Sequence, residues 1–214
     1  MELQERLAAY VRLFGQRPDL HLWRSEWGTP ASIPELPESA GFLSRATLRF
    51  AWSFEPPYGE KPQGDGGHLF LSACHDRGWE GPDGRWLAGA SSSLLVDMMV
   101  EEGIGLLVVD EGHELAQGQM AFYDANDDRL IRLGSLEQYL TLGARRGFAW
   151  YWQNDENFQW LDLVARLHAS SLGSGSTEEA LVSALTSRGA SELEARALVA
   201  WLGDDVRILI PRES

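Results

Sequence analysis

The sequence predicts an α+β protein with a central, mostly antiparallel sheet packed by helices and a small helical extension at the C-terminal side. Three observations predict this class: an N-terminal helical period, short apolar runs separated by turn residues in the middle, and helix-start signals in the last third. The chain has 214 residues, of which 44% are hydrophobic. That length allows a main α+β domain over 1–170 and a small helical tail over 176–214.

The first expected element is an amphipathic helix. Five apolar residues from Leu3 to Phe14 share one face of a 3.6-residue period. Gly15 is expected to end this helix in the left-handed conformation. Residues 18–41 are rich in proline, serine and glycine and predict an irregular connection.

The middle of the chain predicts strands separated by loops. Apolar alternation within 42–54 favours a strand, and 68–74 favours a second one. Residues 55–67 carry prolines and glycines that are typical of a loop. Residues 91–102 place four apolar side chains on one helical face and favour a helix, whereas 104–109 is a short apolar run typical of a buried strand.

A β-hairpin is expected next. Gln119–Tyr123 and Leu130–Leu133 both favour strands, and they flank the turn-forming cluster Asp124–Asp128. Each of these two segments is therefore predicted to form one arm of an antiparallel hairpin.

The last third predicts helices that begin with capping boxes, in which a serine is followed three residues later by glutamate or glutamine. Asn154–Ser170 predicts a further helix from its apolar period, and Gly189 and Gly203 are expected to end the two helices of the tail. Alternation over Val206–Ile210 favours a terminal strand. The expected capping boxes are Ser135 with Gln138, Ser176 with Glu179, and Ser191 with Glu194.

The amino-acid composition indicates the cellular compartment of the protein and the kinds of molecule that it could bind. Cys74 is the single cysteine, so neither an internal disulfide nor a zinc site with two thiolates is possible, which suits a reducing cytoplasm. No apolar run is long enough for a membrane span, and the N-terminal residues do not resemble a secretory signal. The net charge of −14 would repel nucleic acid and anionic lipid and attract a basic protein. Solubility alone is an alternative reason for this charge.

The residues that could carry chemistry do not match standard catalytic or metal-binding spacings. Asp124–Asp128 begins like a calcium loop, but Arg129 and Ser135 stand where glycine and glutamate are needed, so a plain turn is favoured. Cys74 and His75 are adjacent, and on a strand they would point to opposite faces. A buried structural thiol is the simpler interpretation of Cys74.

Two further segments are candidate sites. Asp110–Glu114 clusters three carboxylates and His113 after a predicted strand, but it lacks a second histidine for a metal. A solvated acidic turn that docks a basic partner is favoured there. Gly64–Gly67 is followed by neither the lysine of a P-loop nor a dinucleotide fingerprint, so no cofactor is expected.

Leu36-Pro37 is followed by Phe42-Leu43, then by a middle made of short strands and turns, and then by Tyr123–Leu140. Through these features residues 30–145 resemble the SUKH superfamily. In the last stretch an acidic turn leads to a short strand and then to a helix that begins at a serine. The family's helix and Asn-Gly-Gly turn after Leu-Pro are missing, and Leu136 stands where an aromatic residue is usual.

The resemblance implies an α+β domain with a central sheet. It also implies a bacterial immunity protein that binds and neutralises a cognate toxin, often a basic nuclease, and it implies no catalytic residues. Two other hypotheses stay open: a hydrolase that uses Cys74 or the Asp110–Glu114 cluster, and an intracellular scaffold that contacts its partner through 176–214. The residues expected to bind a protein partner are Asp110, Glu111, Glu114, Asp124, Asp127, Asp128, Trp79 and Trp86.

Overall fold

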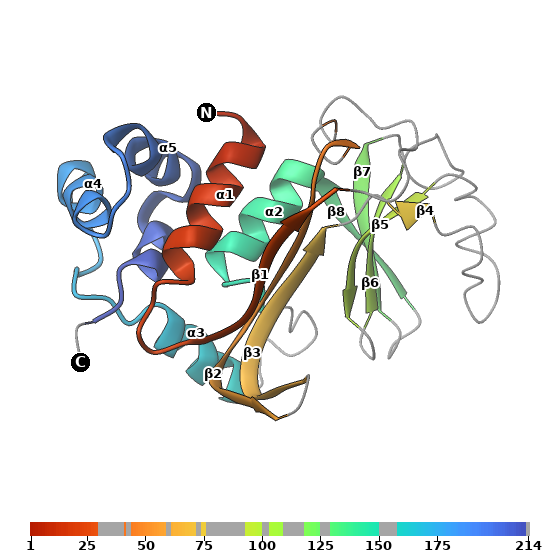
Figure 1. The fold of residues 1–214 in the computed structure, drawn as a ribbon, viewed down its shortest axis with the longest axis horizontal. Coiled ribbons are helices and arrows are strands. Elements are labelled where there is room, and N and C mark those ends of the chain that lie inside the picture. Colours follow the sequence, from red (N-terminus) through yellow and green to blue (C-terminus); the bar gives the residue numbers. More distant parts are fainter. Residues whose placement is uncertain are drawn as a thin grey trace. The chain divides into compact units, whose positions relative to one another are not determined.

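The computed structural model confirms the α+β class. It describes residues 1–29, 41, 44–58, 61–71, 74–75, 93–99, 103–108, 118–124, 129–149 and 158–212. Over these residues the chain forms five α-helices, a 3₁₀ helix and eight strands (Figure 1). The strands form one sheet of three and one sheet of five.

The chain divides into two compact units. The first contains 1–25, 50–68 and 141–214, and the second contains 26–49 and 69–140. The helices near the C-terminal end therefore belong to the same unit as the N-terminal helix, and the second unit is formed by the intervening chain.

The first unit holds most of the helices. The N-terminal helix is confirmed as α1 (Leu3–Phe14), where Glu5 accepts a hydrogen bond of 3.0 Å from the Glu2 N–H. The expectation for Gly15 was wrong: its φ is −66°, so it continues the right-handed turn. Glycine serves packing at this position, because the side chain of Leu22 lies 2.9 Å from where a Cβ of Gly15 would be.

The tail forms α4 (Glu178–Ser187), α5 (Glu192–Leu202) and the 3₁₀ helix η2 (Gly203–Leu209). The predicted terminal strand over Val206–Ile210 was wrong. In the described chain the only bridge near it is the isolated pair Ser170 and Pro211, so a strand there would lack a partner. Instead η2 follows α5 directly, and its apolar side chains are buried.

The capping residues of the tail are partly as predicted. Ser191 and Glu194 form the expected capping box, with the Glu194 N–H donating to the Ser191 hydroxyl at 3.2 Å. The box expected at Ser176 was wrong, because Thr177 caps α4 and accepts from the Ala180 N–H at 3.3 Å. The helices end where the glycines were expected to stop them, α4 at Ser187 and α5 at Leu202, and Gly189 and Gly203 have positive φ values of 88° and 61°.

An aromatic cluster forms the core of the first unit. Phe14 stacks on Tyr10 at 5.6 Å between ring centroids and lies 5.3 Å from Trp52. The polar atoms of these rings are satisfied, since the Tyr10 hydroxyl donates to the Ala144 carbonyl at 2.7 Å and the Trp52 indole donates to the Gly147 carbonyl at 2.6 Å. Burial with a hydrogen-bond partner is how large aromatic residues stabilise a core.

The three-stranded sheet has the order β1-β2-β3 and corrects two predictions. The irregular connection expected over 18–41 contains β1 (His21–Gly28). Its side chains are exposed or half-buried, so the sequence carries no apolar alternation to mark this edge strand. The strand predicted within 42–54 is confirmed as part of β2 (Thr47–Tyr58).

The loop expected over 55–67 was also wrong, because β2 runs to Tyr58 and β3 (Lys61–Leu71) begins soon after. The glycines there allow close backbone approach within a strand. A Cβ on Gly67 would lie 2.7 Å from the Phe148 carbonyl oxygen, and that oxygen accepts a 3.0 Å hydrogen bond from the His68 N–H.

The five-stranded sheet lies in the second unit and is antiparallel throughout. The strand predicted over 104–109 and the hairpin predicted over 119–133 are confirmed. In chain order the strands are β4 (Cys74–His75), β5 (Ser93–Met99), β6 (Gly103–Val108), β7 (Gln119–Asp124) and β8 (Arg129–Ser135).

The helix predicted over 91–102 was wrong, because this segment contains β5. A register shift between Leu95 and Asp97 interrupts the pairing of β5 with β6. Such a bulge shifts the two-residue alternation, so the apolar residues on either side of it imitate a helical spacing.

Two further helices precede and follow residues 150–157, which lie outside the described residues. α2 (Leu136–Arg145) opens with the predicted capping box, in which Ser135 and Gln138 exchange hydrogen bonds of 2.8 and 3.2 Å. α3 (Phe158–Leu167) confirms most of the helix expected over 154–170. It ends before Ser170, whose backbone instead pairs with Pro211.

Candidate partner-binding site

The predicted partner-binding residues fall mostly outside the described part of the chain. Asp124 is the last residue of β7, and its backbone pairs with Arg129. The remaining seven lie outside the described residues: Asp110, Glu111, Glu114, Asp127, Asp128, Trp79 and Trp86.

The strand register defines two opposite ends of the five-stranded sheet. At one end, Met99 pairs with Gly103, Gly103 with Asp124, and Asp124 with Arg129. We call this the Asp124 end. At the other end, Ser93 pairs with Val108, and Gln119 pairs with Ser135. We call this the Val108 end, and β6 separates the two ends by about 16 Å at 3.3 Å per residue.

The predicted site residues divide between these ends. Chain segment 76–92 joins the end of β4 to the start of β5, and segment 109–117 joins the end of β6 to the turn before β7. Both segments leave and re-enter the sheet at the Val108 end. They carry Trp79, Trp86, Asp110, Glu111 and Glu114.

The remaining predicted residues belong to the Asp124 end. Segment 125–128 joins β7 to β8 and carries Asp127 and Asp128. Segment 100–102 joins β5 to β6, whose ends Met99 and Gly103 are at the same end of the sheet, where Gly103 is paired with Asp124. The register therefore separates the eight predicted residues into two groups, of which only one contains Asp124.

Two acidic residues at the Asp124 end were missed from the sequence. Glu101 and Glu102 lie in segment 100–102, which the sequence had assigned to the end of a helix. Recognising β5 as a strand would have turned the same segment into a hairpin connection. The signal that could have found it is the abrupt change from apolar residues to two glutamates and Gly103.

Acidic residues are densest at the Asp124 end. Its two segments hold four carboxylates in seven residues and neither lysine nor arginine. The two segments at the Val108 end hold six carboxylates in 26 residues, together with Arg77 and Arg85. Like charges in such density repel one another, and a cationic partner relieves that repulsion.

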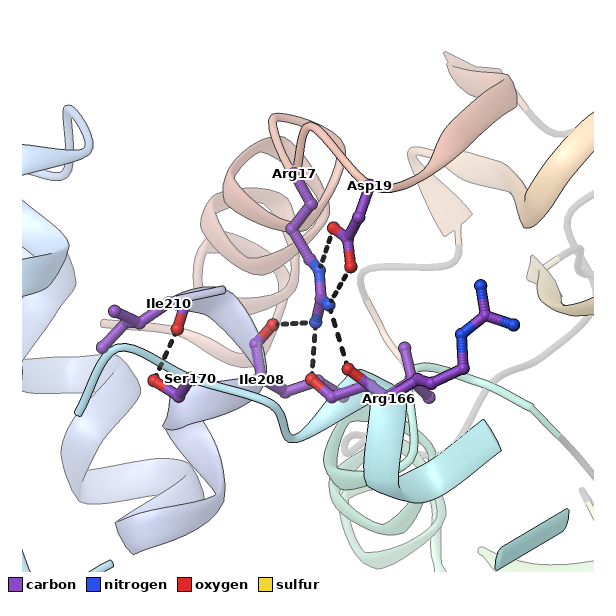
Figure 2. A network of polar contacts seen from close by, with 7 residues as sticks. Arg17, Asp19, Arg166, Ser170, Ile208 and Ile210 are labelled. Atoms are coloured by element: carbon purple, nitrogen blue, oxygen red, sulfur yellow. Dashed lines mark hydrogen bonds and ion pairs between the residues drawn. The ribbon is translucent and has the colours of Figure 1, made fainter. Parts of the chain in front are cut away.

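A second polar cluster lies in the first unit around Arg17 (Figure 2). The guanidinium group of Arg17 is fully buried and donates to the carbonyls of Leu167 at 2.6 Å and Ile208 at 2.7 Å. It also binds both carboxylate oxygens of Asp19, at 2.6 and 3.0 Å. Burial tends to raise the pKa of Asp19, but the hydrogen bonds and charge of Arg17 bring that pKa below its usual value.

The Arg17 cluster has a structural role. Its donors point at backbone carbonyls in the last residue of α3 and near the end of η2, so they join the N-terminal segment to two later segments of the same unit. Burying the guanidinium group is tolerated because its charge and its N–H groups are paired.

The residues that the hydrolase hypothesis uses lie only partly in the described chain, because the Asp110–Glu114 cluster is outside it. Cys74 is in β4 and its backbone pairs with Leu95, whereas His113 lies outside the described chain. No group of three or more metal-ligating side chains occurs in the described part of the chain. Over the same residues, no helix has the length and apolar character needed to cross a bilayer.

The tail also has internal contacts that bear on the scaffold hypothesis. Both α5 and η2 pack against α1, and Leu198, Leu202 and Val206 are almost fully buried. Of the tryptophans with described side chains, Trp27 is exposed, while Trp52 and Trp201 are buried. The apolar face of the tail is therefore used within the first unit.

The described chain is thus an α+β protein with a three-stranded sheet and a five-stranded antiparallel sheet. No family model, curated protein or solved structure was found to match it.

Proposed function

We propose that the protein is a non-catalytic, cytoplasmic immunity protein that binds and neutralises a basic toxin, such as a nuclease. The observation that carries this proposal is the juxtaposition of two acidic hairpin connections at the Asp124 end. They add a concentrated negative field to a chain whose net charge is already −14. The resemblance of residues 30–145 to the SUKH superfamily supports the same function.

The physical basis is electrostatic complementarity. A nuclease carries a basic groove for its nucleic-acid substrate, and an acidic surface can cover that groove. Opposite fields raise the association rate constant from about 10⁵–10⁶ to as much as about 10⁸–10⁹ M⁻¹s⁻¹ at low salt. Buried charge pairs at such an interface cost about 2–5 kcal/mol when one partner is truncated.

The first experiment is to mix the protein with the product of a neighbouring toxin-like gene. We expect a stable complex and loss of the toxin's activity, with an association rate that falls steeply as salt concentration rises. Absence of a complex, or of any such gene, would overturn the proposed function.

The position of the site is tested by two triple variants that change the charge equally. One neutralises the Asp124 end with Asp124→Asn, Asp127→Asn and Asp128→Asn. The other neutralises the Val108 end with Asp110→Asn, Glu111→Gln and Glu114→Gln. Each set removes three carboxylates, so the net charge rises from −14 to −11 in both.

We expect the first set to weaken binding by at least about a hundredfold, which corresponds to about 2.7 kcal/mol. The second set should lower only the association rate, by the amount that long-range steering accounts for. Glu101→Gln with Glu102→Gln should also weaken binding if the surface is placed correctly. A larger loss from the Val108 set would move the site to the other end of the sheet.

A further inference from the structure

The first unit contains an open cavity of about 570 Å³ between the segment that follows α3 and the end of η2. Residues 168–174 form one wall, and Arg207 and Arg212 belong to the other. This volume lies within the range of pockets that hold small organic ligands.

The two walls are fastened to each other. The Ser170 hydroxyl donates to the Ile210 carbonyl at 2.5 Å (Figure 2), and the Arg212 N–H donates to the Ala169 carbonyl at 3.3 Å. Ser170 also forms the isolated backbone bridge with Pro211. The cavity is therefore preformed, which lowers the entropic cost of binding a ligand.

The charge of the lining is opposite to that of the chain. His168, Arg207 and Arg212 line the cavity, and its described lining residues include neither aspartate nor glutamate. The chain as a whole has 32 acidic residues and 18 lysines and arginines. A wall of this composition favours an anion.

Hydrogen bonds hold both guanidinium groups in place, and each group has N–H donors without a partner among the described residues. Arg212 uses its Nε to donate to the Ser170 carbonyl at 3.2 Å, and its terminal nitrogens have no partner among the described residues. Arg207 is held by Asp204, through its Nε to the carbonyl at 3.0 Å and one terminal nitrogen to the carboxylate at 3.1 Å. Its second terminal nitrogen has no partner in the described part of the chain.

Hydroxyl donors complete the lining. Ser171 and Ser174 are exposed, and neither hydroxyl has a hydrogen-bond partner within the described chain. Two guanidinium groups and serine hydroxyls match the several oxygens of a tetrahedral phosphate better than the two oxygens of a carboxylate.

We propose that this cavity binds the phosphate group of a small phosphate monoester. Arg207 and Arg212 would hold the phosphate oxygens, with Ser171 and Ser174 as further donors. The cavity exceeds the size of a phosphate ion, so the organic part of the ligand would lie against Ala169 and Leu172. This site lies in the first unit and is independent of the proposed partner surface in the second.

The test is an NMR titration of the full chain at constant ionic strength. Inorganic phosphate and ribose 5-phosphate are the probes, and ribose is the control without a phosphate. We expect saturable shifts of amides within 168–174 and 207–212 with both phosphates, tighter binding of ribose 5-phosphate, and no shifts with ribose. Absence of saturation with either phosphate would overturn the proposal.

Variants separate a built site from general charge. Arg212→Ala should weaken ribose 5-phosphate binding by at least about tenfold, the loss expected from one charged hydrogen bond. The matched control is Arg196→Ala, which removes the same charge from α5 and only exposed ion pairs with Glu178 and Glu192. It should change the affinity by less than about twofold. Equal effects of the two variants would contradict a specific site.

A second variant keeps the test decisive if Arg212→Ala fails to fold. Arg207→Lys retains the positive charge but loses the planar fork that contacts two oxygens at once. We expect weaker binding of both phosphates with an unchanged amide spectrum elsewhere. Unchanged affinity would show that the guanidinium geometry plays no part.

Discussion

Replacing Arg17 by methionine should destabilise the first unit strongly. Methionine keeps much of the aliphatic volume but removes every hydrogen bond of the guanidinium group. The carbonyls of Leu167 and Ile208, which accept at 2.6 and 2.7 Å, would lose their buried donor. Asp19 would lose its partner as well.

The magnitude follows from those contacts. A hydrogen bond from a charged donor contributes about 1.5–3 kcal/mol, and two are lost to carbonyls that stay buried. The exposed fraction of the Asp19 side chain is 41%, so solvent screens that ion pair and little is added for it. We expect the free energy of unfolding to fall by about 3–5 kcal/mol, in line with the loss of one partner from a buried polar cluster.

Urea unfolding followed by tryptophan fluorescence measures this change, and the thermal midpoint should fall by roughly 6–20 °C. The control is Arg12→Met, in the same N-terminal segment. Arg12 contacts the tail through Glu194 at 2.9 Å and the Gly189 carbonyl at 3.1 Å, but its side chain is 39% exposed. We expect a loss below about 1 kcal/mol.

The comparison between the two arginine variants tests whether Arg17 holds the tail against the N-terminal segment. If Arg17→Met lowers the free energy of unfolding no more than Arg12→Met does, then burial does not make the contacts of the Arg17 guanidinium group more stabilising. The inference that Arg17 fastens the tail would be wrong in that case. A large loss for Arg17→Met and a small one for Arg12→Met is the outcome the contacts predict.

Four further predictions concern the first unit. Tyr10→Phe removes the 2.7 Å hydrogen bond to the Ala144 carbonyl, which keeps its 3.3 Å bond from the Gly147 N–H, and should cost about 1 kcal/mol in urea unfolding. Because Arg17 lowers the pKa of Asp19, this group stabilises the fold fully above the ordinary pKa and loses that contribution as pH falls through the lowered value. Acid titrations of stability should therefore be flatter for Asp19→Asn than for the parent chain. Gly147→Ala combines a φ of 63° with a Cβ placed 3.1 Å from the Phe14 ring, so it should cost about 3 kcal/mol or more. Gly175→Ala has a φ of 79° but no neighbour within 4 Å among the described residues, and calorimetry should show a loss of only about 1–2 kcal/mol.

Features that depend on a few adjacent residues were predicted well. The capping boxes at Ser135 and Ser191 need only a serine and a side chain three positions later, and both form. The hairpin of β7 and β8 likewise depends on local alternation around a turn. The error at Ser176 is of the same local kind, because Thr177 is an equally suitable cap one residue away.

The features that sequence patterns missed depend on distant parts of the chain. Gly67 is a residue type that favours a loop, but in the structure it lies in β3 and allows this strand to pass close to the Phe148 carbonyl. The burial of Arg17 depends on carbonyls about 150 and 190 positions away. A single sequence contains no local signal for such contacts.

The candidate site shows the same division. Acidic composition and the turn after Asp124 were evident from the sequence. The pairing of Gly103, which follows Glu101 and Glu102 in the chain, with Asp124, which precedes that turn, is a matter of strand register. Register depends on partners that a list of local preferences does not specify.

The contacts of Arg17 also constrain the order in which a ribosome-bound chain reaches its native state. All strands of the second unit are complete once residue 135 has been synthesised. The carbonyl of Ile208, which accepts a hydrogen bond from Arg17, is synthesised only about 70 residues later. At about 5–20 residues per second, this delay lasts roughly 4–14 seconds. During that time α1 lacks the apolar face of α5 and η2, so the nascent chain exposes a surface to which chaperones bind.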